Sequence, residues 1–424
     1  MTGAARPGYA LYVLGLLLAL LSLSYADRYL FSILMPAIKA EFGTSDTVLG
    51  LIAGPGFIVS YILFTLPLAQ AADRWSRRKV LALSAAVWSA ATAACGLAAG
   101  AAQIAAARVV VGIGEAGAMP AAQSMVASLF SEKRRSSAIG ILTAAPYIGT
   151  VAGLAGGGAL AAIVGWREAF LWLALPGLPL ALLVWLTGPK RMAVETAAET
   201  PAPSGIATLR RCWSIPSLRL LALGAGTYNV FGYAGATWLP SYFMRSHGMS
   251  MIEAGTWLGV GAAVGGVAGT VGSGVLIDRL KTRDARWQLW LPALAFLLSF
   301  PMTLAMLLVP GGLAISGVPV VALLSVVTGF LAAMWFGPSL AAVASLVRPG
   351  DRAQAGAILV LVISVVGSLV GPVAAGIASE VLTPRFGAEA LRYGLLGLSW
   401  IILLASLLFW RAARRYRSDL AAAA

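Results

Sequence analysis

The sequence predicts an all-α integral membrane protein with twelve transmembrane helices, arranged as two pseudo-symmetric six-helix bundles. Three observations lead to this fold class: the composition, the regular recurrence of long apolar stretches, and a weak internal duplication. Of the 424 residues, 59% are hydrophobic and only 11% are charged. A soluble protein carries about 25% charged residues, so this composition is typical of a polytopic membrane protein.

Apolar stretches recur along the whole chain. A helix needs about 20 predominantly apolar residues to cross about 30 Å of hydrocarbon, and each of these stretches is long enough to do so. We expect spans near residues 9–38, 47–72, 80–100, 103–130, 137–163, 168–187, 217–243, 251–277, 287–309, 317–347, 354–380 and 391–411.

The formal net charge of +14 could indicate a nucleic-acid partner, but the positions of the basic residues argue against one. With twelve spans, the clusters fall on the side of the N-terminus. They are Arg6, Arg74/Arg77/Arg78/Lys79, Lys133/Arg134/Arg135, Lys190/Arg191/Arg210/Arg211, Arg279/Lys281/Arg283/Arg286, Arg348/Arg352 and Arg411/Arg414/Arg415/Arg417. Cytoplasmic loops are the ones that carry such an excess. We therefore expect both termini in the cytoplasm, a bacterial inner membrane, and no nucleic-acid partner.

The two halves of the chain resemble each other. Six positions recur with a shift of 205 residues, namely Gly43, Gly50, Gly54, Gly56, Asp73 and Arg74 with Gly248, Gly255, Gly259, Gly261, Asp278 and Arg279. Chance alignment of glycine-rich sequence is the alternative, and the return of Asp-Arg in the same loop argues against it. We predict an N-terminal bundle over 1–187, a cytoplasmic linker over 188–216, and a C-terminal bundle with a short basic tail over 217–424. Parallel repeats of this kind place a midplane site between two rocking halves.

Four ionised residues lie inside apolar spans of the first half: Asp27, Arg28, Arg108 and Glu115. A charge at membrane depth costs about 2.5–3.5 kcal/mol on translocon scales, so such residues usually serve a function. Arg108, Glu115 and Met119 share one helix face. The first two are about 10 Å apart along the axis, too far for an easy direct pair. We therefore expect Arg108 to pair with Asp27 and Glu115 with Arg28.

These four residues suggest two functions. Asp27 and Glu115 are candidates for proton coupling, with Asp27 the first choice, because a nearby arginine or anion changes the proton affinity of a partly dry carboxylate. Arg28 and Arg108 are candidates for binding a substrate head group, because a guanidinium matches phosphate geometry. The alternative is a static network that holds the first helix against the fourth.

Glycines in the fourth span match a nucleotide-binding pattern by accident. Gly112, Gly114 and Gly117 fit G-x-G-x-x-G, but that motif needs a strand, a turn and a helix, and here one apolar segment runs through 103–130. We expect no cofactor. Arg108-x-x-x-Gly112-x-Gly114 resembles instead the fourth-helix motif of the major facilitator superfamily, although Val111 replaces its usual glutamine.

Two loops extend this resemblance. Asp73-Arg74-Trp75-Ser76-Arg77-Arg78 resembles the superfamily signature between helices 2 and 3, and Asp278-Arg279 resembles its second copy. In the superfamily these loops latch a cytoplasmic gate, which implies that role for Asp73, Arg74, Arg77, Arg78, Asp278 and Arg279. The alternative for these residues is a topology signal alone.

The first and fourth spans resemble one family within the superfamily. Tyr25-Ala26-Asp27-Arg28-Tyr29 and the segment from Gly112 to Ala122 are similar to the spinster family. Its members are linked to export of sphingosine 1-phosphate and lysophospholipids, with proton coupling proposed for bacterial forms. The resemblance implies a secondary active, proton-coupled transporter of an amphipathic anionic lipid-like substrate, working by rocker-switch alternating access. The alternative is a proton-coupled symporter or antiporter of small organic anions or drugs.

The second half has no in-span charge comparable to Asp27, but it is rich in aromatic residues. We predict a substrate cavity lined by Met119 of the first half and by Tyr228, Asn229, Phe231, Tyr233, Trp238, Met334, Trp335 and Phe336. A charged half facing an aromatic half suits a substrate with a head and a tail. The alternative is that these side chains pack in the core or face lipid.

Other classes of protein fit the sequence less well. A membrane-embedded enzyme would need a nucleophile with a base, a carboxylate–histidine pair or a metal set, and a receptor built on a transporter fold would favour an added soluble domain. We expect neither, and no metal. We expect a monomer whose partners are a small amphipathic or anionic substrate, protons and membrane lipid.

Overall fold

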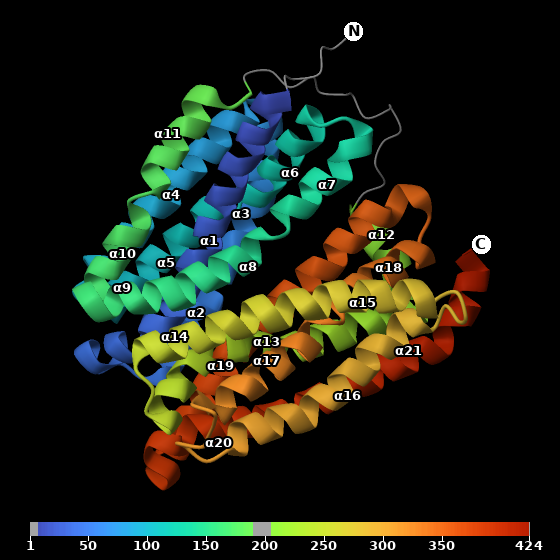
Figure 1. Ribbon diagram of the computed structural model, residues 1–424. Coiled ribbons are helices and arrows are strands. Elements are labelled where there is room, and N and C mark those ends of the chain that lie inside the picture. Colours follow the sequence, from blue (N-terminus) through green and yellow to red (C-terminus); the bar gives the residue numbers. More distant parts are fainter. Residues whose placement is uncertain (1–6, 190–204, 424) are drawn as a thin grey trace. The chain divides into compact units, whose positions relative to one another are not determined.

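The computed structural model describes residues 7–189 and 205–423, and it is built almost entirely of helices (Figure 1). Contacts divide the chain into two compact units, Met1–Glu199 with Met249–Gly259, and Thr200–Gly248 with Val260–Ala424. One boundary between the units falls inside residues 188–216, and Met249–Gly259, which includes the start of the predicted eighth span, groups with the first unit. The predicted domain bounds stay a prediction. The two units are described separately below.

The predicted spans correspond to helices of the structure. Within the described residues, ten helical stretches are long and apolar enough to cross a membrane. The last of them, Gln354–Ala422, contains both the eleventh and the twelfth predicted spans. Helix α13 (Pro216–His247) coincides with the seventh predicted span without being one of the ten. The multi-pass helical fold predicted from the sequence is therefore confirmed.

The first unit contains the helices of the first six predicted spans, several of which are broken. Its helices are α1 (Pro7–Phe42), α2 (Asp46–Ala53), α3 (Pro55–Arg74), α4 (Arg77–Gly96), α5 (Ala101–Glu115), α6 (Ala118–Leu129), α7 (Glu132–Leu142), α8 (Ala145–Val151), η1 (Ala152–Gly156), α9 (Gly157–Val164), α10 (Trp166–Ala174) and α11 (Gly177–Thr187). Two breaks coincide with proline, at Gly54-Pro55 and at Leu175-Pro176, because proline lacks the N–H that would continue the helix.

The second unit contains the remaining spans and one short hairpin. Its elements are α12 (Gly205–Ser214), α13, η2 (Gly261–Gly266), α15 (Val267–Leu280), α16 (Trp287–Leu308), β1 (Ala314–Ile315), β2 (Val318–Pro319), α17 (Val320–Ala333), α18 (Phe336–Leu346), η3 (Pro349–Asp351), α19 (Arg352–Phe386), η4 (Gly387–Glu389), α20 (Ala390–Ser399) and α21 (Ile401–Ala423). Helix α14 (Met251–Val260) ends at the boundary between the units. Ser316 and Gly317 close the hairpin with positive φ angles, as a tight two-residue turn requires.

The duplication found in the sequence recurs in the backbone. The first helix of each half is long, 36 residues for α1 and 32 for α13. Gly43, just after α1, has a φ of 60°, and Gly248, just after α13, has a φ of 64°. These two glycines are one of the pairs 205 residues apart. Glycine adopts this left-handed conformation without the steric cost that other residues pay, so both helices end in the same way.

Glycines bring the helices of the first unit close together. A Cβ on Gly112 of α5 would lie 2.5 Å from the carbonyl oxygen of Phe57 on α3, and a Cβ on Gly114 would lie 2.7 Å from the backbone nitrogen of Trp88 on α4. The glycine pattern that imitates a nucleotide motif is therefore a packing surface inside a helix. In the same way, a Cβ on Gly149 of α8 would lie 2.5 Å from the carbonyl oxygen of Ser22 on α1. Small residues allow this approach in membranes.

The predicted linker is described only in part. Residues 190–204, which include the predicted basic residues Lys190 and Arg191, lie outside the described residues, as does Arg6. The remainder of the linker contains a helix that the sequence did not predict, α12, before Pro216 begins α13.

Candidate functional site

Two ion pairs join α1 to α5 inside the first unit. Arg108 pairs with Asp27, and Arg28 pairs with Glu115. This is the crossed arrangement predicted from helix geometry, so the predicted pairing is confirmed. Asp27 and Arg28 are consecutive on α1, so their side chains leave the helix about 100° apart around its axis. The long arginine side chains cover the remaining distance to the partners on α5.

The Asp27–Arg108 pair is closed off on all sides. The side chains are 3% and 2% exposed, respectively. Arg108 Nη1 donates to Asp27 Oδ2, and Thr92 Oγ1 of α4 donates to Asp27 Oδ1 over 2.7 Å. Both carboxylate oxygens therefore have a partner. Removing one member of such a pair leaves an unpaired buried charge, which costs about 3–5 kcal/mol, so this pair is held tightly in this conformation.

Only one member of the Arg28–Glu115 pair is fully buried. Glu115 Oε2 accepts three hydrogen bonds, from Arg28 Nη2 at 2.6 Å, Arg28 Nε at 2.9 Å and Ser24 Oγ at 2.7 Å. The Glu115 side chain is fully buried, whereas the Arg28 side chain is 28% exposed. Part of the Arg28 side chain therefore lies outside the helix packing, whereas the Glu115 side chain lies wholly within it.

Aromatic rings surround the two guanidinium groups. The ring centroid of Phe57 on α3 is 4.5 Å from the Arg28 guanidinium carbon and 5.3 Å from that of Arg108. Tyr25 and Tyr61 lie 4.9 and 5.4 Å from the same atom of Arg28. Ring faces attract cations, more strongly where water is excluded. Phe57 thus separates two like charges and contacts both.

Two polar atoms of the site lack a hydrogen-bond partner among the described residues. They are Arg108 Nε and Glu115 Oε1, and both are buried. Buried polar atoms nearly always form hydrogen bonds, so an atom without one requires an explanation, either a functional role or a bound water. Glu115 Oε1 is a carboxylate oxygen that can accept a proton or a hydrogen bond without breaking an existing one.

The sequence did not identify three residues that complete this site: Ser24, Phe57 and Thr92. Each is a common residue in an apolar helix, and none stands out in composition. Ser24 could have been proposed, because it lies four residues before Arg28 on one face of the first helix. Met119, predicted to line the cavity, is half-buried on α6, beyond the break at Ala116 and Gly117.

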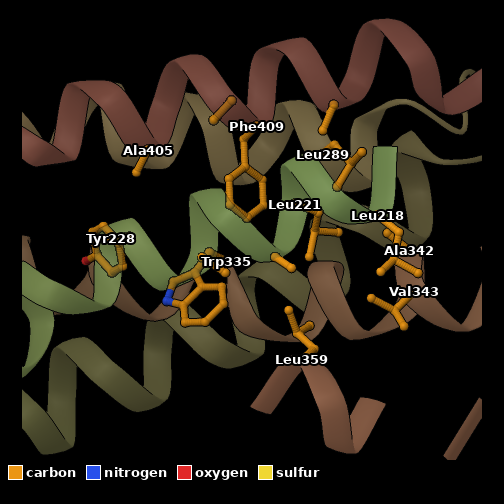
Figure 2. Packing of buried hydrophobic residues seen from close by; sticks show 14 of the residues in the cluster. Leu218, Leu221, Tyr228, Leu289, Trp335, Ala342, Val343, Leu359, Ala405 and Phe409 are labelled. Atoms are coloured by element: carbon orange, nitrogen blue, oxygen red, sulfur yellow. The ribbon is translucent and has the colours of Figure 1, made fainter. Parts of the chain in front are cut away.

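The predicted aromatic residues of the second unit are mostly packed in its core (Figure 2). Tyr228 stacks on Phe296 with ring centroids 4.0 Å apart and meets Trp335 edge-on at 6.1 Å. Trp238 is fully buried, and its Nε1 donates to the carbonyl of Pro372 over 2.9 Å. These contacts match the packing alternative more closely than direct substrate contact. Their role in a cavity stays a prediction.

Five other predicted cavity residues of the second unit have different surroundings. Met334 and Phe231 are buried, Tyr233 is half-buried, and Phe336 is 42% exposed. Asn229 is half-buried, and its Nδ2 donates to the carbonyl of Ala225 one turn earlier. Phe336 is therefore the predicted aromatic residue most accessible to a ligand.

The predicted gate residues make local contacts within their own loops. Arg77 Nη2 lies 3.0 Å from Asp73 Oδ1, and Lys281 Nζ lies 2.6 Å from Asp278 Oδ1. Both carboxylates are largely exposed, as are Arg74 and Arg279. Arg78 also donates to the carbonyl of Gly188 over 3.4 Å. Their gating role stays a prediction, because pairs within one loop do not distinguish a gate from a topology signal.

No metal centre accompanies the site. Across residues 7–189 and 205–423, no group of three or more His, Cys, Asp and Glu side chains is placed to hold a metal ion.

Comparison with known proteins agrees with this architecture. Residues 17–311 match the family described as Major Facilitator Superfamily. An MFS-type efflux pump of Mycolicibacterium smegmatis is 34% identical, over 98% of this chain and 95% of the relative. A hexuronate transporter of Bacillus subtilis is 27% identical, over 62% of this chain and 63% of the relative. A crystal structure of a bacterial homologue of the human lysosomal transporter Spinster, inward-facing and unoccupied, superimposes with a TM-score of 0.88 at 26% identity, covering 98% and 99% of the two chains.

Proposed function

Since this chain belongs to the major facilitator superfamily of membrane transporters and is of the spinster type, we propose that it is a proton-coupled secondary active transporter of an amphipathic anion. The substrate class is a lysophospholipid or a related lipid phosphate. Transport proceeds by alternating access, with Arg28 holding the anionic head group and Asp27 carrying the proton.

The observation that carries this proposal is the unequal exposure of Arg28 and Glu115. The Arg28 side chain is 28% exposed, and its guanidinium is bound to a carboxylate with no exposure. An arriving anion can approach Arg28 and compete with Glu115 for its N–H donors, and a phosphate accepts such bonds well. Glu115 is then left with Ser24 as its remaining partner, which makes it the internal competitor of the substrate.

We assign the proton to Asp27 because its protonation would change its pairing with Arg108. Protonating Asp27 weakens its bond to Arg108, and the freed guanidinium must find other partners. Asp27 and Arg28 are consecutive on α1, and Phe57 contacts both guanidinium groups. A change in one pair therefore reaches the other, which is what coupling between a proton and an anion requires.

A small organic anion is the second candidate substrate. The hexuronate transporter of Bacillus subtilis is similar to 62% of this chain, and a sugar acid would also bind Arg28. The exposed ring of Phe336 favours a substrate with an apolar tail over such an anion. Because an efflux pump of Mycolicibacterium smegmatis is similar to this chain, export of a drug-like compound is a further candidate function.

The remaining expectations belong to the same proposal. The protein resides as a monomer in a bacterial inner membrane with both termini in the cytoplasm, as the one-sided basic clusters favour. Asp73, Arg74, Arg77, Arg78, Asp278 and Arg279 open and close the cytoplasmic side.

The experiment is pH-dependent binding of three probes to detergent-purified protein: lysophosphatidylglycerol, zwitterionic lysophosphatidylcholine and glucuronate. We expect lysophosphatidylglycerol to bind more tightly than the other two, with an affinity that changes with pH. In Asp27→Asn the binding remains and its pH dependence disappears.

Two results would contradict the proposal. If glucuronate alone binds, the lipid assignment is wrong. If Asp27→Asn is folded, judged by size-exclusion chromatography and thermal unfolding, and keeps the wild-type pH profile, then Asp27 does not carry the proton.

A further inference from the structure

A small cavity lies beside Asp27, and Arg28 is not among the residues that line it. It is lined by Leu23 and Asp27 of α1, Trp88, Ser89 and Thr92 of α4, and Leu173 and Ala174 of α10. All these residues belong to the first unit. The cavity has room for about one water molecule, and its lining includes Asp27, two hydroxyls and the indole of Trp88, all of which carry groups that can bond a water.

Two residues of this lining have a buried polar atom without a hydrogen-bond partner among the described residues, Trp88 at Nε1 and Ser89 at Oγ. Ser89 is 1% exposed. A Cβ on Gly177 of α11 would overlap Ser89 Oγ, so α11 can approach this hydroxyl only because residue 177 is glycine. A buried hydroxyl left without a partner costs about 1–3 kcal/mol, and that cost is avoided if the hydroxyl bonds a water.

Thr92 connects the cavity to the carboxylate. Its Oγ1 donates to Asp27 Oδ1 over 2.7 Å and keeps its own lone pairs for another donor. A water between Ser89 and Thr92 would have two to three polar partners, counting Asp27, which is the number that buried waters usually have.

We propose that this cavity binds a water molecule that exchanges protons with Asp27 through the hydroxyl of Thr92. In the uptake direction, Thr92 Oγ1 passes its proton to Asp27 Oδ1 and takes one from the water, which takes one from a hydronium ion. At Thr92 Oγ1 and at the bound water, one O–H bond breaks and one forms. Asp27 Oδ1 gains an O–H bond, and the hydronium ion loses one. Ser89 holds the water in place and is a positioning residue.

The proposal rests on the proposed function in taking Asp27 as the proton carrier, and it adds a separate route. Asp27 faces α4 and the cavity, whereas Arg28 faces the rings of α3. Proton and head group therefore reach consecutive residues of α1 from different sides. The charged and titratable groups around Asp27 are Arg108 and Glu115 of α5, Arg28, and the thiol of Cys95 on α4, and the lining residues of α10 are neutral.

The test is infrared difference spectroscopy of purified protein between about pH 8 and about pH 5. The carboxylic-acid band that is missing in Asp27→Asn reports protonated Asp27, and the rate at which it shifts in D2O reports proton access. Ala174→Val fills the cavity without changing a polar group. The matched control is Ala181→Val, because Ala181 is equally buried in the same span and does not line the cavity.

We expect Ala174→Val to slow the exchange at least tenfold, Ser89→Ala to slow it severalfold, and Ala181→Val to leave it unchanged. Equal rates in all of these proteins would overturn the water relay while leaving Asp27 as the proton carrier. If wild type and Asp27→Asn show the same bands, Asp27 takes up no proton in this range, and both the relay and the proposed proton site are wrong. Anion binding to Ala174→Val should match wild type, which separates the relay from a general loss of structure.

Discussion

The interiors of the two units of this protein are packed with different kinds of side chain. In the first unit, four ionised side chains form two ion pairs within the helix packing. The second unit instead packs aromatic rings, with Tyr228, Phe296 and Trp335 in mutual contact. Buried ion pairs seldom add stability over apolar packing of similar volume, so the second arrangement is the less costly one. Under the proposed function, the first unit keeps these charges for transport.

The largest effect is expected when the partly exposed cation, Arg28, is removed. Arg28→Gln should weaken binding of lysophosphatidylglycerol about 10- to 100-fold, because a charge-assisted hydrogen bond contributes about 1.5–3 kcal/mol. Isothermal titration or a fluorescence assay would measure this. Arg414→Gln, at an exposed position on α21, is the control and should bind as wild type. Unchanged affinity in Arg28→Gln would move the head-group site elsewhere.

Removing the partner of that cation should have the opposite effect. Glu115→Gln takes away the internal competitor for Arg28, so anion affinity should rise by about tenfold, which is about 1.4 kcal/mol. A network that only holds α1 against α5 predicts a less stable protein with no gain in affinity. Binding and thermal unfolding measured on the same preparation distinguish the two, and a fall in affinity would count against competition.

The aromatic side of the comparison can be tested with neighbouring residues. Phe336 is 42% exposed and Trp335 is 6% exposed. Phe336→Ala should weaken lysophosphatidylglycerol binding about fivefold and leave glucuronate unaffected, since partial burial of a phenyl ring is worth about 1 kcal/mol. Trp335→Ala should instead lower the unfolding temperature, because it empties a core position. If both variants bind the lipid normally, the tail does not contact this part of α18.

The smallest effect is expected at an ion cluster of the second unit outside the spans. Asp284, between α15 and α16, accepts from Arg286 and Arg417 at 2.8 and 2.9 Å, and the hydrogen bond from Arg286 is the main reason that the pKa of Asp284 is lowered. Its contribution to stability is present above the unfolded-state pKa, about 3.9, and is lost as the pH falls through the lower folded-state value.

Asp284→Asn should therefore lower the free energy of unfolding by less than about 1 kcal/mol, because ion pairs at the protein surface contribute little. The decrease should be the same at pH 6 and at pH 8. Thermal unfolding at both pH values measures this. Asp278→Asn, which loses only a pair within its own helix end, is the matched control and should cost less still. A large loss at Asp284 would show that charge matters as much for the second unit as for the first.

Much of the fold and the pairing at the site could be predicted from the sequence. Apolar length alone predicts the spans, and the shared helix face of Arg108 and Glu115 predicts which residue of α1 each one meets. The partners contributed by other helices could not be predicted. Thr92 and Phe57 reach the ion pairs because Gly114 and Gly112 let α4 and α3 approach α5, and such contacts depend on tertiary packing.

Other features were missed for local reasons. Helix α12 lies in a polar, proline-containing segment that reads as a linker, and the hairpin of β1 and β2 is only two residues long on each strand. The substrate-cavity role of Trp238 was inferred from its residue type. Its full burial and its bond to Pro372 are visible only once α19 is in place beside α13.

The most direct test of the central claim is proton movement in proteoliposomes during lysophosphatidylglycerol transport, in wild type and Asp27→Asn. A pH-sensitive dye enclosed in the vesicles reports the protons, and a labelled lipid reports transport. The account predicts that wild type moves protons together with the lipid, and that Asp27→Asn exchanges lipid without moving protons. Proton movement that persists in folded Asp27→Asn would contradict it.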